Sequence, residues 1–183
     1  MKNLPNILSC FRIMLVPFFV WAFLGLGNIP LACSIYVLAG LTDIIDGYIA
    51  RKYNLITKMG IVLDPLADKL LQLTVTATIA ISGIAFMWVV FGILFIKEVL
   101  MSVGTFLLNK RKDVVVPAVW YGKVSSAYLF IVAFVILAFR QHLHENILIA
   151  LAFSALSLCV FAFIGYMLNF RAIVKKGKSN ETI

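Results

Sequence analysis

Residues 43–68 read DIIDGYIARKYNLITKMGIVLDPLAD and carry four of the chain's eight acidic residues. Asp43 and Asp46 are three positions apart, and Asp64 and Asp68 are four apart. On a helix, either spacing places both side chains on one face, about 5–6 Å apart. Two such faces turned toward each other would form a cage of four carboxylates. Because hard divalent cations prefer oxygen ligands and share them with substrate phosphates, the stretch predicts a metal site for a phosphorylated substrate.

The other polar and small residues of the stretch suit a phosphate ligand. Gly47 and Gly60 lack side chains, which lets a bulky ligand approach the backbone closely. Ala50 keeps the next helical turn small, and Arg51 offers a planar guanidinium that matches phosphate oxygens. We therefore expect these four residues to line the phosphate side of the site.

The pattern D-x2-D-G-x2-A-R-x8-G-x3-D-x3-D over residues 43–68 resembles the complete signature of the CDP-alcohol phosphatidyltransferase family. The resemblance covers most of the chain, because the order of hydrophobic segments also fits that family. It implies a membrane enzyme that moves a phosphatidyl group from CDP-diacylglycerol to an alcohol and releases CMP. It also implies two Mg²⁺ or Mn²⁺ ions on the four aspartates, a nucleotide and phosphate site at Gly47, Ala50, Arg51 and Gly60, and Asp68 as general base.

Composition independently places the chain in a bilayer. Hydrophobic residues make up 63% and charged residues 13%, with a mean hydropathy of +1.04, whereas soluble domains carry about 25% charged residues. A chain of 183 residues has room for about six spans of ~20 residues. We expect an all-α integral membrane protein with about six transmembrane helices, a short N-terminal interfacial segment and one domain over residues 1–183.

The apolar segments and the turn residues between them predict the spans. Residues 27–30 (GNIP) and 82–83 (SG) are typical of turns, and residues 51–58 and 109–113 are polar, basic loops. Both acidic pairs then lie near one membrane face, where the second span ends and the third begins. The predicted spans lie within residues 1–27 and at about 31–50, 60–81, 84–108, 118–139 and 147–168, followed by a polar basic tail at 171–183.

The net charge of +8 indicates topology rather than nucleic-acid binding. Most lysines and arginines lie at the N-terminus, in the loops at 51–58 and 109–113, and in the tail, whereas the opposite loops contain Arg140 alone. By the positive-inside rule, the termini and the acidic site face the cytoplasm and the protein lies in the inner membrane.

Five further residues are candidates for binding the acceptor or a lipid headgroup. Residues 5–12 (PNILSCFR) resemble the N-terminal pattern of family members that make phosphatidylglycerol phosphate or cardiolipin; the alternative is an interfacial helix whose arginine extends to the headgroups. Charged residues inside a span usually face a polar cavity or each other, so Lys97 in the fourth span either serves the substrate or contacts the acidic cluster. For Arg111, in the basic loop at 109–113, a solvated position without a ligand is the favoured alternative. The five candidates are Asn6, Arg12, Lys97, Arg111 and Lys123.

The acceptor is the main open question. The N-terminal pattern and the LDPLADK run at 63–69 favour glycerol 3-phosphate, which gives phosphatidylglycerol phosphate. The stretch 97–106, KEVLMSVGTF, lacks a second arginine that many such enzymes carry, so a cardiolipin synthase using phosphatidylglycerol is the alternative. An ion or proton transporter also places carboxylates in a membrane, but here the acids cluster at one face and no internal repeat is visible. The resemblance further implies a homodimer.

Overall fold

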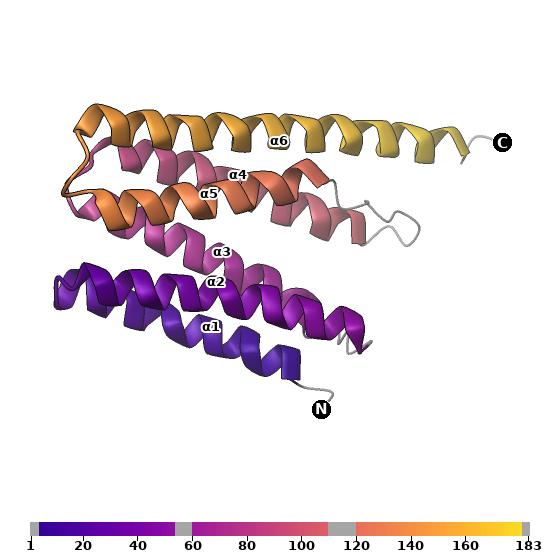
Figure 1. The fold of residues 1–183 in the computed structure, drawn as a ribbon. Helices are drawn as coiled ribbons and strands as arrows, with labels where there is room; N and C mark the ends of the chain where they lie inside the picture. The colour runs from indigo at the N-terminus through magenta and orange to yellow at the C-terminus, as the bar shows by residue number, and fades with distance from the viewer. Residues whose placement is uncertain (1–3, 54–59, 110–119, 181–183) are drawn as a thin grey trace.

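The computed structural model describes residues 4–53, 60–109 and 120–180. These residues form helices that run side by side as a bundle, with both termini at the same end (Figure 1). The predicted all-α architecture with six long helices is confirmed. In chain order the elements are α1 (Leu4–Val20), the π-helix η1 (Trp21–Gly25), α2 (Ile29–Lys52), α3 (Gly60–Ile81), α4 (Phe86–Asn109), α5 (Trp120–Phe139) and α6 (Glu145–Asn180).

Two predicted turns close the bundle at the end opposite the termini (Figure 1). Gly27 has φ +62° and Gly83 has φ +108°, a backbone conformation that favours glycine. After the first turn, the Asn28 side chain accepts a hydrogen bond from the Leu31 amide at 3.0 Å, and Pro30 occupies the first turn of α2. The chain therefore reverses direction where the sequence predicts.

Helix α1 packs against both α2 and α3, and each of these makes its most extensive contact with α1. The two acidic faces considered from the sequence are therefore carried by helices that both pack on α1, which lies against each of them. Since α1 is continuous from Leu4 to Val20, the expected interfacial segment forms its first turns. Large side chains buried at the helix contacts are Phe19, Tyr36, Val75, Ile79, Leu94, Ile136 and Leu137.

The outside of the bundle is apolar. Large hydrophobic side chains such as Ile44 and Phe161 are 67% and 69% exposed, which water would penalise but lipid tails accommodate. Among the described residues, three helical segments are long and apolar enough to cross a bilayer, and Val124–Phe139 is a shorter apolar segment. The protein is therefore an integral membrane protein. The three segments are Asn6–Gly25, Ile29–Ile49 and Glu145–Leu168.

Helix α6 continues far beyond its apolar part. Residues 171–180, expected as a separate polar tail, extend the helix to Asn180, and α6 projects past the rest of the bundle in Figure 1. The physical reason is that residues 169–176, NFRAIVKK, contain no proline or glycine that would end the helix.

Gly40 of α2 lies against the ring of Phe130 of α5. A Cβ on Gly40 would come within 2.4 Å of Phe130 Cζ, and that ring is stacked on Tyr36 with centroids 4.3 Å apart. We expect Gly40→Ala to lower the free energy of unfolding by about 1–3 kcal/mol, as overpacking does. Thermal unfolding in detergent measures the change. Gly92→Ala is the matched control, since nothing lies within 4 Å of its new Cβ; equal effects would contradict the prediction.

Candidate functional site

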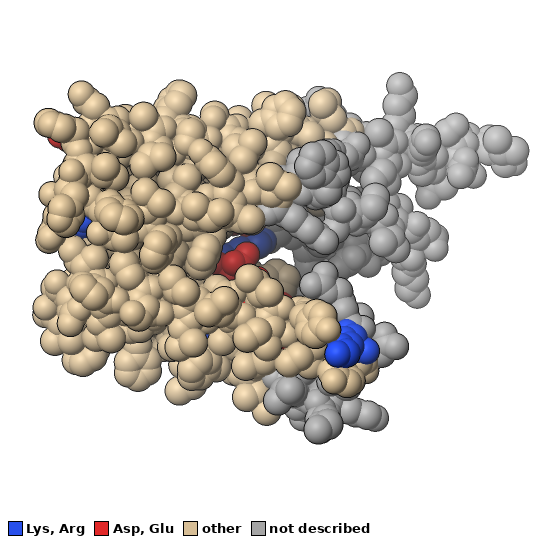
Figure 2. Space-filling model, in the orientation of Figure 1, with Lys and Arg blue, Asp and Glu red and all other residues tan. Residues whose placement is uncertain are grey.

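The four aspartates lie at the end of the bundle where α2 ends and α3 begins. Asp43 and Asp46 are in the last three turns of α2, and Asp64 and Asp68 are in the first turns of α3. Asp46 is buried at 3% exposure, whereas the Asp43 side chain is 48% exposed. Figure 2 shows acidic and basic atoms close together in a hollow of a face that is mostly uncharged. Within the Asp43–Asp46 pair, one carboxylate is therefore accessible and the other is enclosed.

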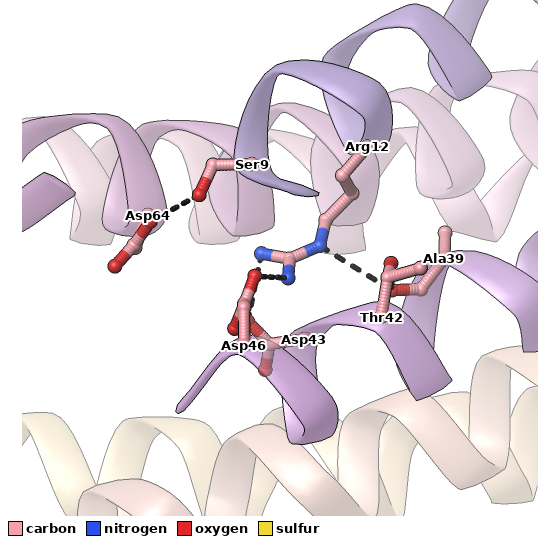
Figure 3. A network of polar contacts seen from close by, with 7 residues as sticks. All are labelled: Ser9, Arg12, Ala39, Thr42, Asp43, Asp46 and Asp64. Carbon is pink, nitrogen blue, oxygen red and sulfur yellow. Dashed lines mark hydrogen bonds and ion pairs between the residues drawn. The ribbon is translucent and has the colours of Figure 1, made fainter. Parts of the chain in front are cut away.

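Arg12 of α1 joins the two aspartates of α2. Its Nη1 lies 2.7 Å from Asp43 Oδ1, and its Nη2 lies 2.6 Å from Asp46 Oδ2. Its Nε donates to the Ala39 carbonyl at 3.3 Å, which also accepts the Thr42 hydroxyl at 2.7 Å (Figure 3). Arg12 has 0% exposure. The alternative in which this arginine extends to the lipid headgroups is therefore wrong, because two carboxylates draw it inward.

Ser9 of α1 makes the corresponding link to α3. It is fully buried, and its hydroxyl donates to Asp64 Oδ1 (Figure 3). Ser9 and Arg12 are three positions apart and so share one face of α1. Sequence reasoning included Ser9 in the N-terminal pattern but missed it as a site residue, although this spacing was the available signal. Helix α1 thus holds carboxylates of both neighbouring helices.

The carboxylates suit a divalent cation in donor type, since all four offer hard oxygen atoms. Among the residues that the structure describes, no group of three His, Cys or acidic side chains lies close enough to hold a metal ion without further ligands, whereas Mg²⁺ is commonly bound by one or two carboxylates together with substrate phosphates. In this part of the chain Ser9 and Arg12 contact three of the four aspartates, and the expected metal site on the four carboxylates stays a prediction. A cation bound here would share those oxygens with α1.

The residues expected beside phosphate groups lie on the same two helix ends. Gly47 follows Asp46 in α2, and Gly60 is the buried first residue of α3. Ala50 and Arg51 lie in the last turn of α2, and their side chains are outside the described part of the structure. Arg51 was expected in a loop, but α2 continues to Lys52 because no proline or glycine interrupts this turn.

A second charged cluster joins α3 to α4. Lys97 Nζ lies 2.7 Å from Glu98 Oε1, and Lys69 Nζ lies 3.1 Å from Glu98 Oε2. The sequence left open whether Lys97 serves the substrate or contacts the aspartates, and in the structure it pairs with its neighbour Glu98. Asp68 lies within electrostatic range of Asp43 and of this cluster. Lys69, which follows Asp68 directly in the sequence, belongs to this cluster but was not among the predicted site residues.

Of the three remaining candidates, two are partly described by the structure and one lies outside the described residues. Asn6 lies in the first turn of α1 and is partly buried. Lys123 lies on α5, but its side chain falls outside the described residues, as does the whole of Arg111. Their expected contacts to an acceptor or headgroup therefore stay predictions.

Known proteins match this chain over most of its length. Residues 2–168 match the family model described as CDP-alcohol phosphatidyltransferase. Three relatives bear the name "CDP-diacylglycerol--glycerol-3-phosphate 3-phosphatidyltransferase". The protein of Shigella flexneri serotype 5b is 33% identical over 93% of this chain and 96% of its own length. That of Pectobacterium atrosepticum is 31% identical over 90% and 93%, respectively.

The third relative, from Rickettsia typhi, is 50% identical over 78 residues, which span 42% of this chain and 44% of that relative. The match to this relative thus covers less than half of its length. The family model alone covers more than half of the present chain and includes the whole aspartate signature. The chain therefore belongs to the CDP-alcohol phosphatidyltransferase family.

Proposed function

We propose that this protein transfers the phosphatidyl group of CDP-diacylglycerol to glycerol 3-phosphate, forming phosphatidylglycerol phosphate and CMP. The observation that carries the proposal is the aspartate signature at the adjoining ends of α2 and α3, in a chain of this family. The names of the relatives from Shigella and Pectobacterium support this acceptor. We assign the activity to a single domain that spans residues 1–183.

Members of this family generally use a divalent metal. We assign two Mg²⁺ or Mn²⁺ ions to Asp43, Asp46, Asp64 and Asp68, whose oxygens match these cations in donor type. When bound, such ions would neutralise negative charge on the diphosphate and on the departing CMP. Gly47 and Gly60 leave room for the diphosphate beside these aspartates.

The chain's own residues then carry the transfer. Asp68 is exposed at the site and accepts the proton of the acceptor hydroxyl. The hydroxyl oxygen forms a bond to the phosphatidyl phosphorus, and the bond from that phosphorus to the CMP oxygen breaks. Ala50 and Arg51, both in the last turn of α2, are assigned to the phosphate side. Lys97, held by Glu98, is assigned to the acceptor side.

The three remaining candidates keep the same assignment. Asn6, Arg111 and Lys123 are proposed to contact the acceptor or a lipid headgroup, because an amide and two cations suit phosphate oxygens. Asn6 lies in the first turn of α1 and Lys123 in the first turn of α5, whereas Arg111 is outside the described residues.

We place the site at the cytoplasmic face of the inner membrane, with both termini on the same side. Lys52 Nζ lies 5.4 Å from the ring centroid of Tyr48 and 5.8 Å from that of Tyr53. Tyrosines and lysines at a helix end are typical of the membrane interface, and excess positive charge is typical of the cytoplasmic side. Association into a homodimer remains part of this proposal.

The cardiolipin synthase alternative rests on sequence features, namely the absence of arginine from residues 97–106 and the resemblance of the AGLTD run at 39–43 and of the Lys97–Glu98 pair to cardiolipin synthases. A transporter is no longer a competing function, because the family consists of phosphatidyltransferases.

Assay of the purified full chain with CDP-diacylglycerol in mixed micelles tests the function. We expect CMP release only when glycerol 3-phosphate and Mg²⁺ or Mn²⁺ are both present, and a fall to background when EDTA removes the cation. Replacing glycerol 3-phosphate with phosphatidylglycerol is the control for the acceptor. Cardiolipin formation in that arm would favour the alternative, and no lipid product with either acceptor would contradict both.

A further inference from the structure

Arg12 has an unusual position for a positive charge in a site that attracts cations. Its Nη2 donates to Asp46 and its Nε donates to the Ala39 carbonyl, whereas its Nη1 lies 2.7 Å from Asp43 Oδ1 as an ion pair without hydrogen-bond geometry. The side chain has no exposed surface, so water does not screen its charge. The guanidinium therefore neutralises one of the two carboxylate charges that α2 contributes.

We infer that Arg12 is a built-in counter-cation that competes with divalent cations for Asp43 and Asp46, and so weakens cation binding. The inference rests on the proposed metal role of these aspartates. Arg12 is a positioning residue here, since it acts through the two carboxylates. Each of its two ion pairs occupies an oxygen that a divalent cation would otherwise use.

Two physical effects point in the same direction. A cation bound by these carboxylates would lie close to a buried guanidinium, and like charges repel strongly where water is excluded. In addition, each ion pair must lengthen or share its oxygen before a cation can take it, and breaking a buried ion pair costs free energy. Ser9 adds a smaller effect of the same kind on Asp64, because its hydroxyl occupies Oδ1 without adding charge.

A purely structural role for Arg12 predicts the opposite result. If the arginine only held the carboxylates in place, its loss would let them drift apart and cation binding would weaken. A counter-cation that competes predicts tighter binding when its charge is removed. The sign of the change therefore separates the two roles.

The test is a titration of purified full-length protein with Mn²⁺ in neutral detergent, with free Mn²⁺ followed by electron paramagnetic resonance. We expect Arg12→Gln to bind Mn²⁺ at least about tenfold more tightly than the wild type, which corresponds to about 1.4 kcal/mol. Arg12→Lys keeps the positive charge but cannot bridge both carboxylates and the carbonyl. Its affinity for Mn²⁺ should therefore lie between that of the wild type and that of Arg12→Gln. The lysine variant also serves if the glutamine variant does not fold.

Arg140→Gln is the matched control. Arg140 donates to the Ser82 carbonyl at 3.1 Å and lies over the Phe23 ring, at the end of the bundle away from the aspartates. Its loss should leave Mn²⁺ affinity unchanged. If the wild type binds Mn²⁺ and both Arg12 variants bind it equally well or more weakly, the inference is wrong but the proposed metal role is kept. An absence of binding by the wild type would overturn it together with the proposed metal role.

Discussion

Asn in place of Asp64 or Asp68 should reduce the rate of CMP release by about 10³-fold or more while the protein still inserts and folds. Asn has nearly the same size as Asp but lacks the negative charge, and its amide cannot accept the acceptor's proton. Removal of a positioned general base or of one charge-stabilising group typically costs 10²–10⁴-fold in rate. Steady-state assay of the purified variants with CDP-diacylglycerol and glycerol 3-phosphate measures the loss.

The control for this prediction is Glu145→Gln. Glu145 is exposed at the start of α6, at the opposite end of the bundle from the aspartates, so its turnover should equal that of the wild type. Gel filtration and thermal unfolding check that the aspartate variants remain folded. Turnover within a factor of about three of the wild type in either aspartate variant would contradict the assigned roles.

Arg12→Met should lower the free energy of unfolding by about 3–5 kcal/mol when no divalent cation is added, as removal of one partner of a buried ion pair does. The reason is Asp46, which is 3% exposed and whose Oδ2 lies 2.6 Å from Arg12 Nη2. Without the arginine, this carboxylate is left buried and charged. Denaturation of the purified protein in detergent and chelator measures the difference.

The double variant Arg12→Met with Asp46→Asn provides the decisive comparison. Because it removes both charges, it should recover a substantial part of the stability that Arg12→Met loses. Asp46→Asn alone should be less damaging than Arg12→Met, since Arg12 keeps Asp43 as a partner at 2.7 Å. Losses that simply add would show that the ion pair with Asp46 does not hold α1 on α2.

Several features could be predicted from residues that are close in sequence. Turns at Gly27 and Gly83 follow from local backbone preference, because glycine adopts positive φ without strain. Helices follow from apolar runs long enough to cross a bilayer, in which every backbone group must find its partner within the helix. The spacing of Asp43 with Asp46 and of Asp64 with Asp68 likewise sets which side chains share a helix face.

The partners of those side chains could not be predicted in the same way. Helical spacing gives the direction of a side chain about its own axis, but it does not say which helix lies opposite. Arg12 could reach lipid headgroups or protein, and its place against α2 depends on how α1 packs. Lys97 could serve the substrate or contact the aspartates, and in the structure it pairs with Glu98, which Lys69 of α3 also contacts.

The sequence by itself determined an all-helical membrane protein of the CDP-alcohol phosphatidyltransferase family, with its aspartates at one end of the bundle. The reason is that hydrophobic length, turn residues and motif spacing are local properties. Only the tertiary structure decided that α1 lies against both α2 and α3, with Arg12 on Asp43 and Asp46 and Ser9 on Asp64. Those contacts join residues 31 to 55 positions apart, and packing of whole helices is what brings them within reach.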